Sequence, residues 1–280
     1  MIGLRYHITS TVAIFIALGL GIFLGSAIVK DDTLARHQES LISRIESEFT
    51  LLRKDRDALY ARLMKTESLL EDSLAFGEKA LTGLICGKLE DKRVALVVPG
   101  RGLSYDEVNA VTATLRSAGA SLSQVVYITK RLEPITSEDT RELAEFCGIA
   151  KPSSHVVGQA LADSIAVLAI QRGTSCSPAV DALLQSDYLE IDLYEQAQCN
   201  AVIIAGGSND PAHTPLYTDI PIIKAFQRLN MPAVLVESGS VDFSFITEYA
   251  HEGIPTIEQV DTPMGRFSLI EQLAKSINGD

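Results

Sequence analysis

Residues 8–29, ITSTVAIFIALGLGIFLGSAIV, contain no charged side chain, and this stretch most limits how the chain can fold. A helix of that length measures about 33 Å at about 1.5 Å per residue, enough to cross a hydrocarbon core of about 30 Å. Arg5 precedes the segment, and the charged residues 30–32 follow it. The sequence therefore predicts a transmembrane helix over 8–29, behind a short N-terminal segment of residues 1–7.

The same stretch also fits a cleaved secretory signal, with Arg5 as the basic region, 12–24 as the apolar core and 25–27 as a small-x-small cleavage site. Against that alternative, the apolar run continues through residues 28–29, and a long charged helical segment follows instead of a folded domain. We therefore favour an uncleaved anchor. A short head before a signal-like segment favours a single pass, with residues 1–7 on the cytoplasmic side and the C-terminal domain outside.

Small residues recur at every fourth position along one face of the predicted membrane helix. Such a ridge lets two helix backbones approach closely in lipid, so it favours pairing of two copies of the chain. The alternative is that Gly and Ala are simply frequent in membrane helices. The ridge consists of Ala13, Ala17, Gly21 and Gly25.

Residues 31–76 contain no Gly or Pro and are rich in Glu, Lys, Arg and Leu. Apolar residues recur there in steps of mostly three and four, which predicts a coiled-coil stalk that pairs two chains in parallel. Polar residues interrupt the seam, and the alternative is an amphipathic helix packed on its own domain. The apolar seam positions are Leu34, Leu41, Ile45, Phe49, Leu52, Leu59, Leu63, Leu70 and Leu74, and the polar ones are Gln38, Arg56 and Thr66.

Gly77, Gly83 and Gly87 are expected to end this helix, and residues 88–280 then provide ample material for one domain. Continuously apolar runs alternate there with helical patterns, which predicts a Rossmann-like α/β domain whose parallel sheet carries helices on both faces. The order of the strands does not follow from the sequence. Strands are predicted at 94–99, 122–128, 201–207, 233–238 and 256–260; helices are predicted at 156–171, 219–229 and 266–277 and directly after Ser104 and Ser137.

Gly-rich loops with Ser, Asn and Asp follow four of the predicted strands, at the carboxyl edge where ligands bind in such sheets. Their backbone N–H groups and the Arg101 guanidinium can hold a carboxylate or phosphate, so we expect a partner or ligand surface at this edge. The alternative is that Gly and Pro merely form the turns. The candidate residues are Gly100, Arg101, Gly102, Gly206, Gly207, Ser208, Asn209, Asp210, Ser238 and Asp261.

The sequence carries no GxSxG, HExxH or GxxxxGK[ST] motif, and Tyr105 stands where a dinucleotide fingerprint needs its third Gly. Cys86, Cys147, Cys176 and Cys199 form no CxxC pair, and His213 and His251 are isolated, which predicts solvated side chains. We therefore expect no enzymatic activity, no cofactor and no metal site. The net charge of −12 argues against binding to nucleic acid.

The layout and several strings resemble the MctB family, named for a mycobacterial copper-transport protein and overlapping the cell-division proteins called SteB. The opening MIGLRYHITSTVAIFIALGLGIFLGS is the most specific part of the resemblance. The stalk, the strand VALVVPG, the string HVVGQALADSI and the string VDTPMGRFSLIEQL extend it over essentially the whole chain.

The resemblance implies a single-pass protein of the bacterial cytoplasmic membrane whose α/β domain lies outside. It also implies two different functions: copper homeostasis by efflux, and a partner role at the division septum in the control of peptidoglycan hydrolysis. Copper would need clustered Cys, Met or His side chains, and these are scattered along the sequence. We therefore rank a dimeric scaffold that binds another envelope or division protein first, and copper handling second.

Overall fold

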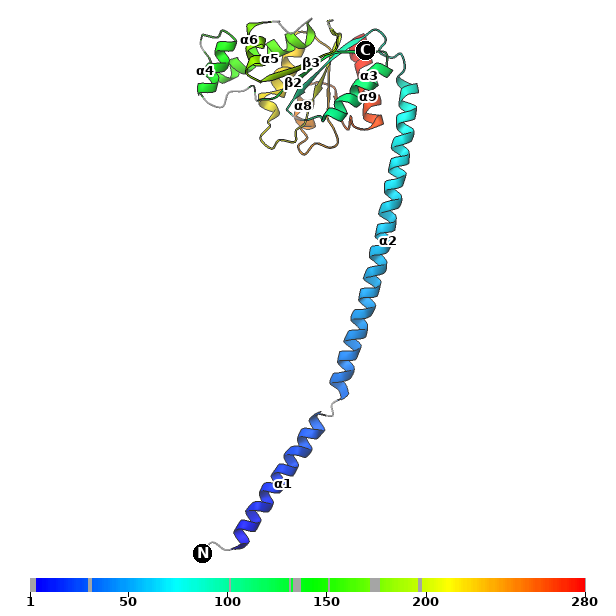
Figure 1. Ribbon diagram of the computed structural model, residues 1–280, viewed down its shortest axis with the longest axis vertical. Helices are drawn as coiled ribbons and strands as arrows, with labels where there is room; N and C mark the ends of the chain where they lie inside the picture. The colour runs from blue at the N-terminus through cyan, green and yellow to red at the C-terminus, as the bar shows by residue number, and fades with distance from the viewer. Residues whose placement is uncertain are drawn as a thin grey trace. The chain divides into compact units, whose positions relative to one another are not determined.

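The computed structural model describes residues 4–29, 32–100, 102–130, 132, 137–150, 152–171, 177–195 and 198–279 (Figure 1). The chain divides into two compact units, one ending at Leu70 and the other running from Glu71 onward. The second unit, which we call the head domain, contains the sheet and all the helices that cover it.

Helix α1, Leu4–Val29, contains the predicted membrane segment. Residues Tyr6–Ala27 form the one span in the described part of the chain that is long and apolar enough to cross a membrane. An apolar helix at this end of the chain agrees with the prediction of a membrane segment.

Helix α2, Asp32–Ile85, continues through Gly77 and Gly83, so the expectation that these residues end it is wrong. Only Gly87, with φ of 74°, follows the helix end. The reason is tertiary packing. A Cβ added at Gly77 would lie 3.1 Å from the Pro263 side chain, and Ile85 is buried in the head domain. These contacts stabilise the helix by more than the roughly 1 kcal/mol by which each Gly, compared with Ala, destabilises it.

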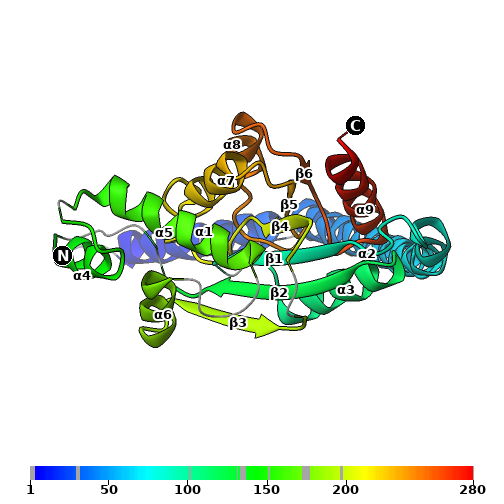
Figure 2. The ribbon, with the colours of Figure 1, turned by 90° about the horizontal axis from the view of Figure 1, so that it is seen from above.

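The head domain contains a six-stranded sheet in the order β3-β2-β1-β4-β5-β6, and Figure 2 shows β3, β2 and β1 side by side. All neighbouring pairs are parallel except β2 and β3. The antiparallel edge strand β3 was not predicted, because its short, partly exposed sequence LEIDL is not a continuously apolar run like those of the predicted strands. The strands are β1 Arg93–Pro99, β2 Ser121–Ile128, β3 Leu189–Leu193, β4 Ala201–Ala205, β5 Ala233–Val236 and β6 Thr256–Ile257.

Helices cover both faces of the sheet, as predicted. Along β1, Ala95 and Val97 join a core with helices α4 to α8, while Val94, Leu96 and Val98 join a second core with α3, α9 and the end of α2. This division explains why the strands are continuously apolar. The helices are α3 Tyr105–Ser117, α4 Ser137–Phe146, α5 Ser154–Ile170, α6 Pro178–Gln185, α7 Asp219–Arg228, α8 Ile246–His251 and α9 Pro263–Asn278, with a 3₁₀ turn η1 at Pro215–Tyr217.

Helix α3 begins with the capping box that its sequence predicts. The Ser104 hydroxyl accepts a hydrogen bond from the Glu107 N–H at 3.3 Å, and Glu107 Oε2 accepts one from the Ser104 N–H at 2.7 Å. This arrangement holds the Glu107 carboxylate beside the loop that follows β1. Its Oε1 atom accepts a hydrogen bond from Ser238 in the loop that follows β5.

Candidate functional site

The strand order places a crevice at the carboxyl edge of the sheet. The chain leaves β1 toward β2 on one side, whereas β4 lies on the other side of β1 and continues to β5. The loops after β1 and β4 therefore run in opposite directions. In open α/β sheets this point of divergence is where ligands bind.

Contacts between the loops show that the predicted edge residues are brought together. A Cβ added at Gly102 would lie 2.3 Å from the Gly206 carbonyl oxygen, so the loops after β1 and β4 touch through their backbones. The Ser238 hydroxyl, after β5, donates to Glu107 Oε1, and the Gly239 N–H donates to Asp261 Oδ1 at 2.7 Å. Arg101, which carried the expectation of anion binding, lies outside the described residues.

Glu107 is the main link between the loops after β1 and β5. Partial burial alone would raise the pKa of this carboxyl, but hydrogen bonds from Ser104, Ser238 and Ser240 lower it below its ordinary value. Its contribution to stability is therefore present above the ordinary pKa and is lost as the pH falls through the lowered one. The hydroxyl groups of Ser104, Ser238 and Ser240 therefore donate hydrogen bonds to Glu107 of the same chain.

Because Gly102 lies so close to the backbone of the next loop, we expect Gly102→Ala to destabilise the head domain by about 1–3 kcal/mol. Urea unfolding of the full chain in nonionic detergent, followed by near-ultraviolet circular dichroism, measures the change. Gly158→Ala is the control, since Gly158 lies inside α5 with no atom within 4 Å of an added Cβ. That variant is expected to be neutral or stabilised by up to about 1 kcal/mol.

A cleft of about 690 Å³ opens at this edge, between the ends of β1, β2 and β4 and the start of β3. Its volume falls in the range of about 300–1,000 Å³ that is typical of small-molecule sites. The polar side chains that line it are Tyr127, Thr129, Glu190, Asn209, Asp210 and His213.

A buried polar group supports the wall of the cleft. His213 Nε2 lies 3.1 Å from both carboxylate oxygens of Asp219, which is fully buried at the start of α7. The hydroxyl of Tyr249, on α8, donates to Asp219 Oδ2, while the Gly207 N–H lies 3.4 Å from the same hydroxyl. We assign the imidazole proton to Nε2, because two acceptor oxygens face that atom.

Burial is the main cause of the pKa shifts of Asp219 and Tyr249. It raises the pKa of Asp219, although the hydrogen bonds from His213 and Tyr249 partly oppose the shift. Burial and then the Asp219 charge also raise the pKa of the Tyr249 hydroxyl, which keeps it a hydrogen-bond donor. A second buried carboxyl, Glu237, has a raised pKa for the same first reason and accepts hydrogen bonds from Ser244 and Phe245.

The prediction that His213 is a solvated loop residue is wrong: its side chain is only 7% exposed. The partners Asp219 and Tyr249 are 6 and 36 residues away in the sequence, and no local motif joins them. The one signal available was Asp219 at the start of a predicted helix. That position alone indicates a favourable helix-dipole interaction and not a buried partner.

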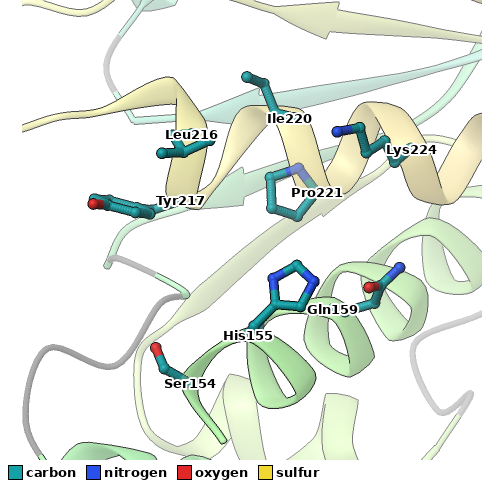
Figure 3. A pocket seen from close by; sticks show the side chains of 9 residues that line it. Ser154, His155, Gln159, Leu216, Tyr217, Ile220, Pro221 and Lys224 are labelled. Carbon is teal, nitrogen blue, oxygen red and sulfur yellow. The ribbon is translucent and has the colours of Figure 1, made fainter. Parts of the chain in front are cut away.

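A smaller groove of about 230 Å³ lies between α5 and the η1–α7 segment and shares no lining residue with the cleft. Figure 3 shows His155 and Gln159 of α5 facing Pro221 of α7. Leu216 and Tyr217 of η1 add exposed apolar surface to the rim.

An α/β head domain together with one helix long and apolar enough to span a membrane is consistent with the class of membrane-anchored α/β proteins. The chain belongs to the MctB family, described as copper transport outer membrane protein, and the match covers residues 1–280. The comparison with curated proteins finds no match. The family resemblance of the sequence is thereby confirmed.

The family description raises the question whether the side chains fit copper. Cys199 is buried and donates to the Ala169 carbonyl, Cys147 is half-buried, and Cys86 is exposed after α2. Burial raises the pKa of the Cys199 thiol to about 11, which disfavours the thiolate that binds metal. Within the described residues, no three His, Cys, Asp or Glu side chains form a group able to hold a metal ion. The described His and Cys side chains therefore do not form a three-ligand copper centre, and Cys176 lies outside the described residues.

Proposed function

We propose that this protein is a non-enzymatic, membrane-anchored homodimer that acts as a scaffold or regulator in the bacterial envelope. In this proposal α1 anchors the chain in the cytoplasmic membrane, α2 pairs with its copy in a parallel coiled coil, and the head domain lies outside. The partner we propose is another envelope protein, of cell division or of peptidoglycan-hydrolase control.

The apolar seam of α2 carries the proposal. The apolar seam side chains from Leu41 to Leu74 are between 39% and 64% exposed in the single chain. Their spacing is that of a coiled coil, in which a second helix would bury them. Burying one such side chain stabilises a complex by about 1.5–3 kcal/mol. The repeat spacing fits a helix with the same repeat, so a second copy of this chain is the simplest partner. The side chain of Leu34 lies outside the described part.

The head domain limits how far the pairing can extend. The same stripe continues from Leu74 to Leu81 and Ile85, in steps of seven and four, and these two residues are buried in the core that includes α9. Arg266 of α9 also pairs with Glu78 of α2. A partner helix has no access to the stripe beyond about Gly77. The last turns of α2 therefore pack on the chain's own head domain, as the alternative to a coiled coil expected. The part of the seam that precedes Gly77 remains available for a second chain.

The ridge of small residues in α1 supports the same pairing. Along it, Gly21 and Gly25 have no atom within 4 Å of an added Cβ, so their backbone is open to a close neighbour. Small-xxx-small ridges and heptad seams prefer opposite crossing hands. We infer that either the geometry of the pair changes between α1 and α2, or the seam of α2 dictates the pairing and the ridge of α1 follows it.

The cleft supports a binding role in preference to catalysis. His213 faces Asp219, but in the described structure no serine, threonine or cysteine side chain hydrogen-bonds this imidazole, so no activated nucleophile is formed. The Ser208 hydroxyl, five residues before His213, is engaged with Asp210.

The oligomeric state tests the proposal directly. Sedimentation of the full chain in density-matched nonionic detergent, at tens of micromolar, is expected to give the mass of a dimer. A monomer under these conditions would remove the pairing on which the scaffold proposal rests.

Copper handling is the alternative function, favoured by the family description alone. We expect titration of the full chain with Cu(I), against a competing chelator, to show no stoichiometric high-affinity site, because the soft ligands are dispersed. Apo protein stripped by the same chelator serves as the baseline. A tight one-to-one site would reverse the ranking and make direct copper handling the preferred function.

A further inference from the structure

The carboxyl-edge cleft presents hydrogen-bond acceptors to its interior. Asp210 uses one carboxylate oxygen to accept from the Ala212 N–H at 2.8 Å, which leaves the other oxygen available. The Thr129 hydroxyl donates its proton to the Asp187 carbonyl, so toward the cleft it can only accept. Glu190, opposite Tyr127 on the neighbouring strand, adds a second carboxylate.

His213 adds an acceptor of a different kind. Its side chain is more than nine-tenths buried, and Asp219 occupies Nε2, so Nδ1 carries the lone pair. In the described structure no group donates a hydrogen bond to Nδ1. Gly100 lies against this side of the imidazole, since a Cβ there would be 3.2 Å from Nδ1. The Gly100 φ of 72° also favours glycine.

Charge around the cleft is negative in the described residues. Lys130 lies close by in sequence, but its Nζ donates to the Ser186 carbonyl and sits over the Tyr188 ring. Burial and then the Asp192 carboxylate raise the pKa of Tyr127 to about 12. The Tyr127 ring is an aromatic wall of the kind that attracts cations.

We propose that this cleft binds primary ammonium groups, which donate to the acceptors along its lining: the carboxylates of Glu190 and Asp210, and His213 Nδ1. An ammonium has three donors and no acceptor, which matches the acceptors that Glu190, Asp210 and His213 contribute to the lining. The Asn209 amide and the Tyr127 hydroxyl add donors to the same lining. The ammonium can come from a free diamine or from a lysine-like side chain of a peptide. This site is independent of pairing through α2 and gives the head domain a defined recognition chemistry.

Three probes of equal chain length and different charge test the proposal: 1,5-diaminopentane, pentane-1,5-diol and glutarate. Saturation-transfer NMR and equilibrium dialysis with the full chain in nonionic detergent are expected to show saturable binding of the diamine only. The blocked peptide acetyl-Gly-Lys-Gly-amide separates the two sources: binding tighter than that of the diamine assigns a peptide side chain, and weaker binding assigns a free amine. Absence of diamine and peptide binding, or saturable binding of glutarate at this cleft, would overturn the proposal.

Matched variants locate the site. Glu190→Gln with Asp210→Asn keeps the shape of the side chains but removes both charges, and we expect diamine binding to weaken by about tenfold. Glu142→Gln with Glu248→Gln removes the same charge from exposed positions elsewhere on the head domain and should leave binding unchanged. Equal weakening in both double variants would indicate unspecific attraction to an acidic protein and contradict the assignment. The single variants, checked for native near-ultraviolet dichroism, give the same test if the double variant fails to fold.

Discussion

Replacing Leu52 and Leu63 by glutamate is expected to convert the full chain from a dimer to a monomer. Both residues belong to the apolar seam of α2, and their side chains are 63% and 52% exposed in the single chain. In a parallel pair the two substitutions affect four buried positions, each worth about 1.5–3 kcal/mol, and they also place carboxylates in the seam. The dissociation constant of the dimer should therefore rise by at least about 1,000-fold.

The chain offers a closely matched control. Leu51 and Met64 are adjacent to the two seam residues, are 59% and 65% exposed, and lie off the seam. Glutamates at these two positions change composition, charge and helix propensity in nearly the same way, but leave the seam intact. The control variant should remain a dimer.

Sedimentation equilibrium in density-matched nonionic detergent measures both variants at the same protein concentrations. Equal dissociation constants for the seam and control variants would mean that α2 does not pair through this stripe. A dimer that survives the seam substitutions would instead place the pairing in α1, where replacing Gly21 and Gly25 by leucine would be the next test.

The fold was largely predictable because its signals are local or periodic. The apolar segment of α1, the capping box at Ser104 and the continuous apolar strands each follow from neighbouring residues. The end of α2 could not be predicted in this way, because the burial of Leu81 and Ile85 in the head domain keeps the helix going past Gly77 and Gly83. Strand β3 was missed because its partly exposed edge position removes the apolar signal.

The candidate site was predictable in position but not in chemistry. Strand ends with Gly-rich loops indicate the carboxyl edge of a parallel sheet, and contacts such as those of Gly102 bring these loops together. The chemistry depends on side chains that meet only after folding: His213, Asp219 and Tyr249 come from a loop and two helices. In sequence His213 is an isolated imidazole, and nothing nearby shows that a buried carboxylate orients it.

Replacing Tyr249 by phenylalanine is expected to destabilise the head domain by about 2–3 kcal/mol. The ring is fully buried and its shape is retained, so no cavity of consequence forms. The lost hydroxyl donates to Asp219, and a buried carboxylate that loses a donor is destabilised by about 1.5–3 kcal/mol. Urea unfolding of the full chain, followed by near-ultraviolet circular dichroism, measures the loss.

Asp219→Asn is the second member of a double-mutant cycle. In that background the neutral amide depends less on the hydroxyl, so Tyr249→Phe should cost only about 1 kcal/mol. Equal costs in the two backgrounds would show that the hydroxyl and the carboxylate are not coupled.

The pH dependence of stability gives the cycle an independent readout. Because the pKa of Asp219 is raised in the folded state, the folded protein holds this proton more tightly than the unfolded one. The contribution of Asp219 to stability is therefore fully present below its ordinary pKa of about 3.8 and is lost as the pH rises through the raised value. Asp219→Asn should remove this loss, so the variant gains stability relative to the wild type as the pH rises. A difference in unfolding free energy that stays constant with pH would mean that the buried carboxyl is not penalised by desolvation, and that His213 balances its charge fully.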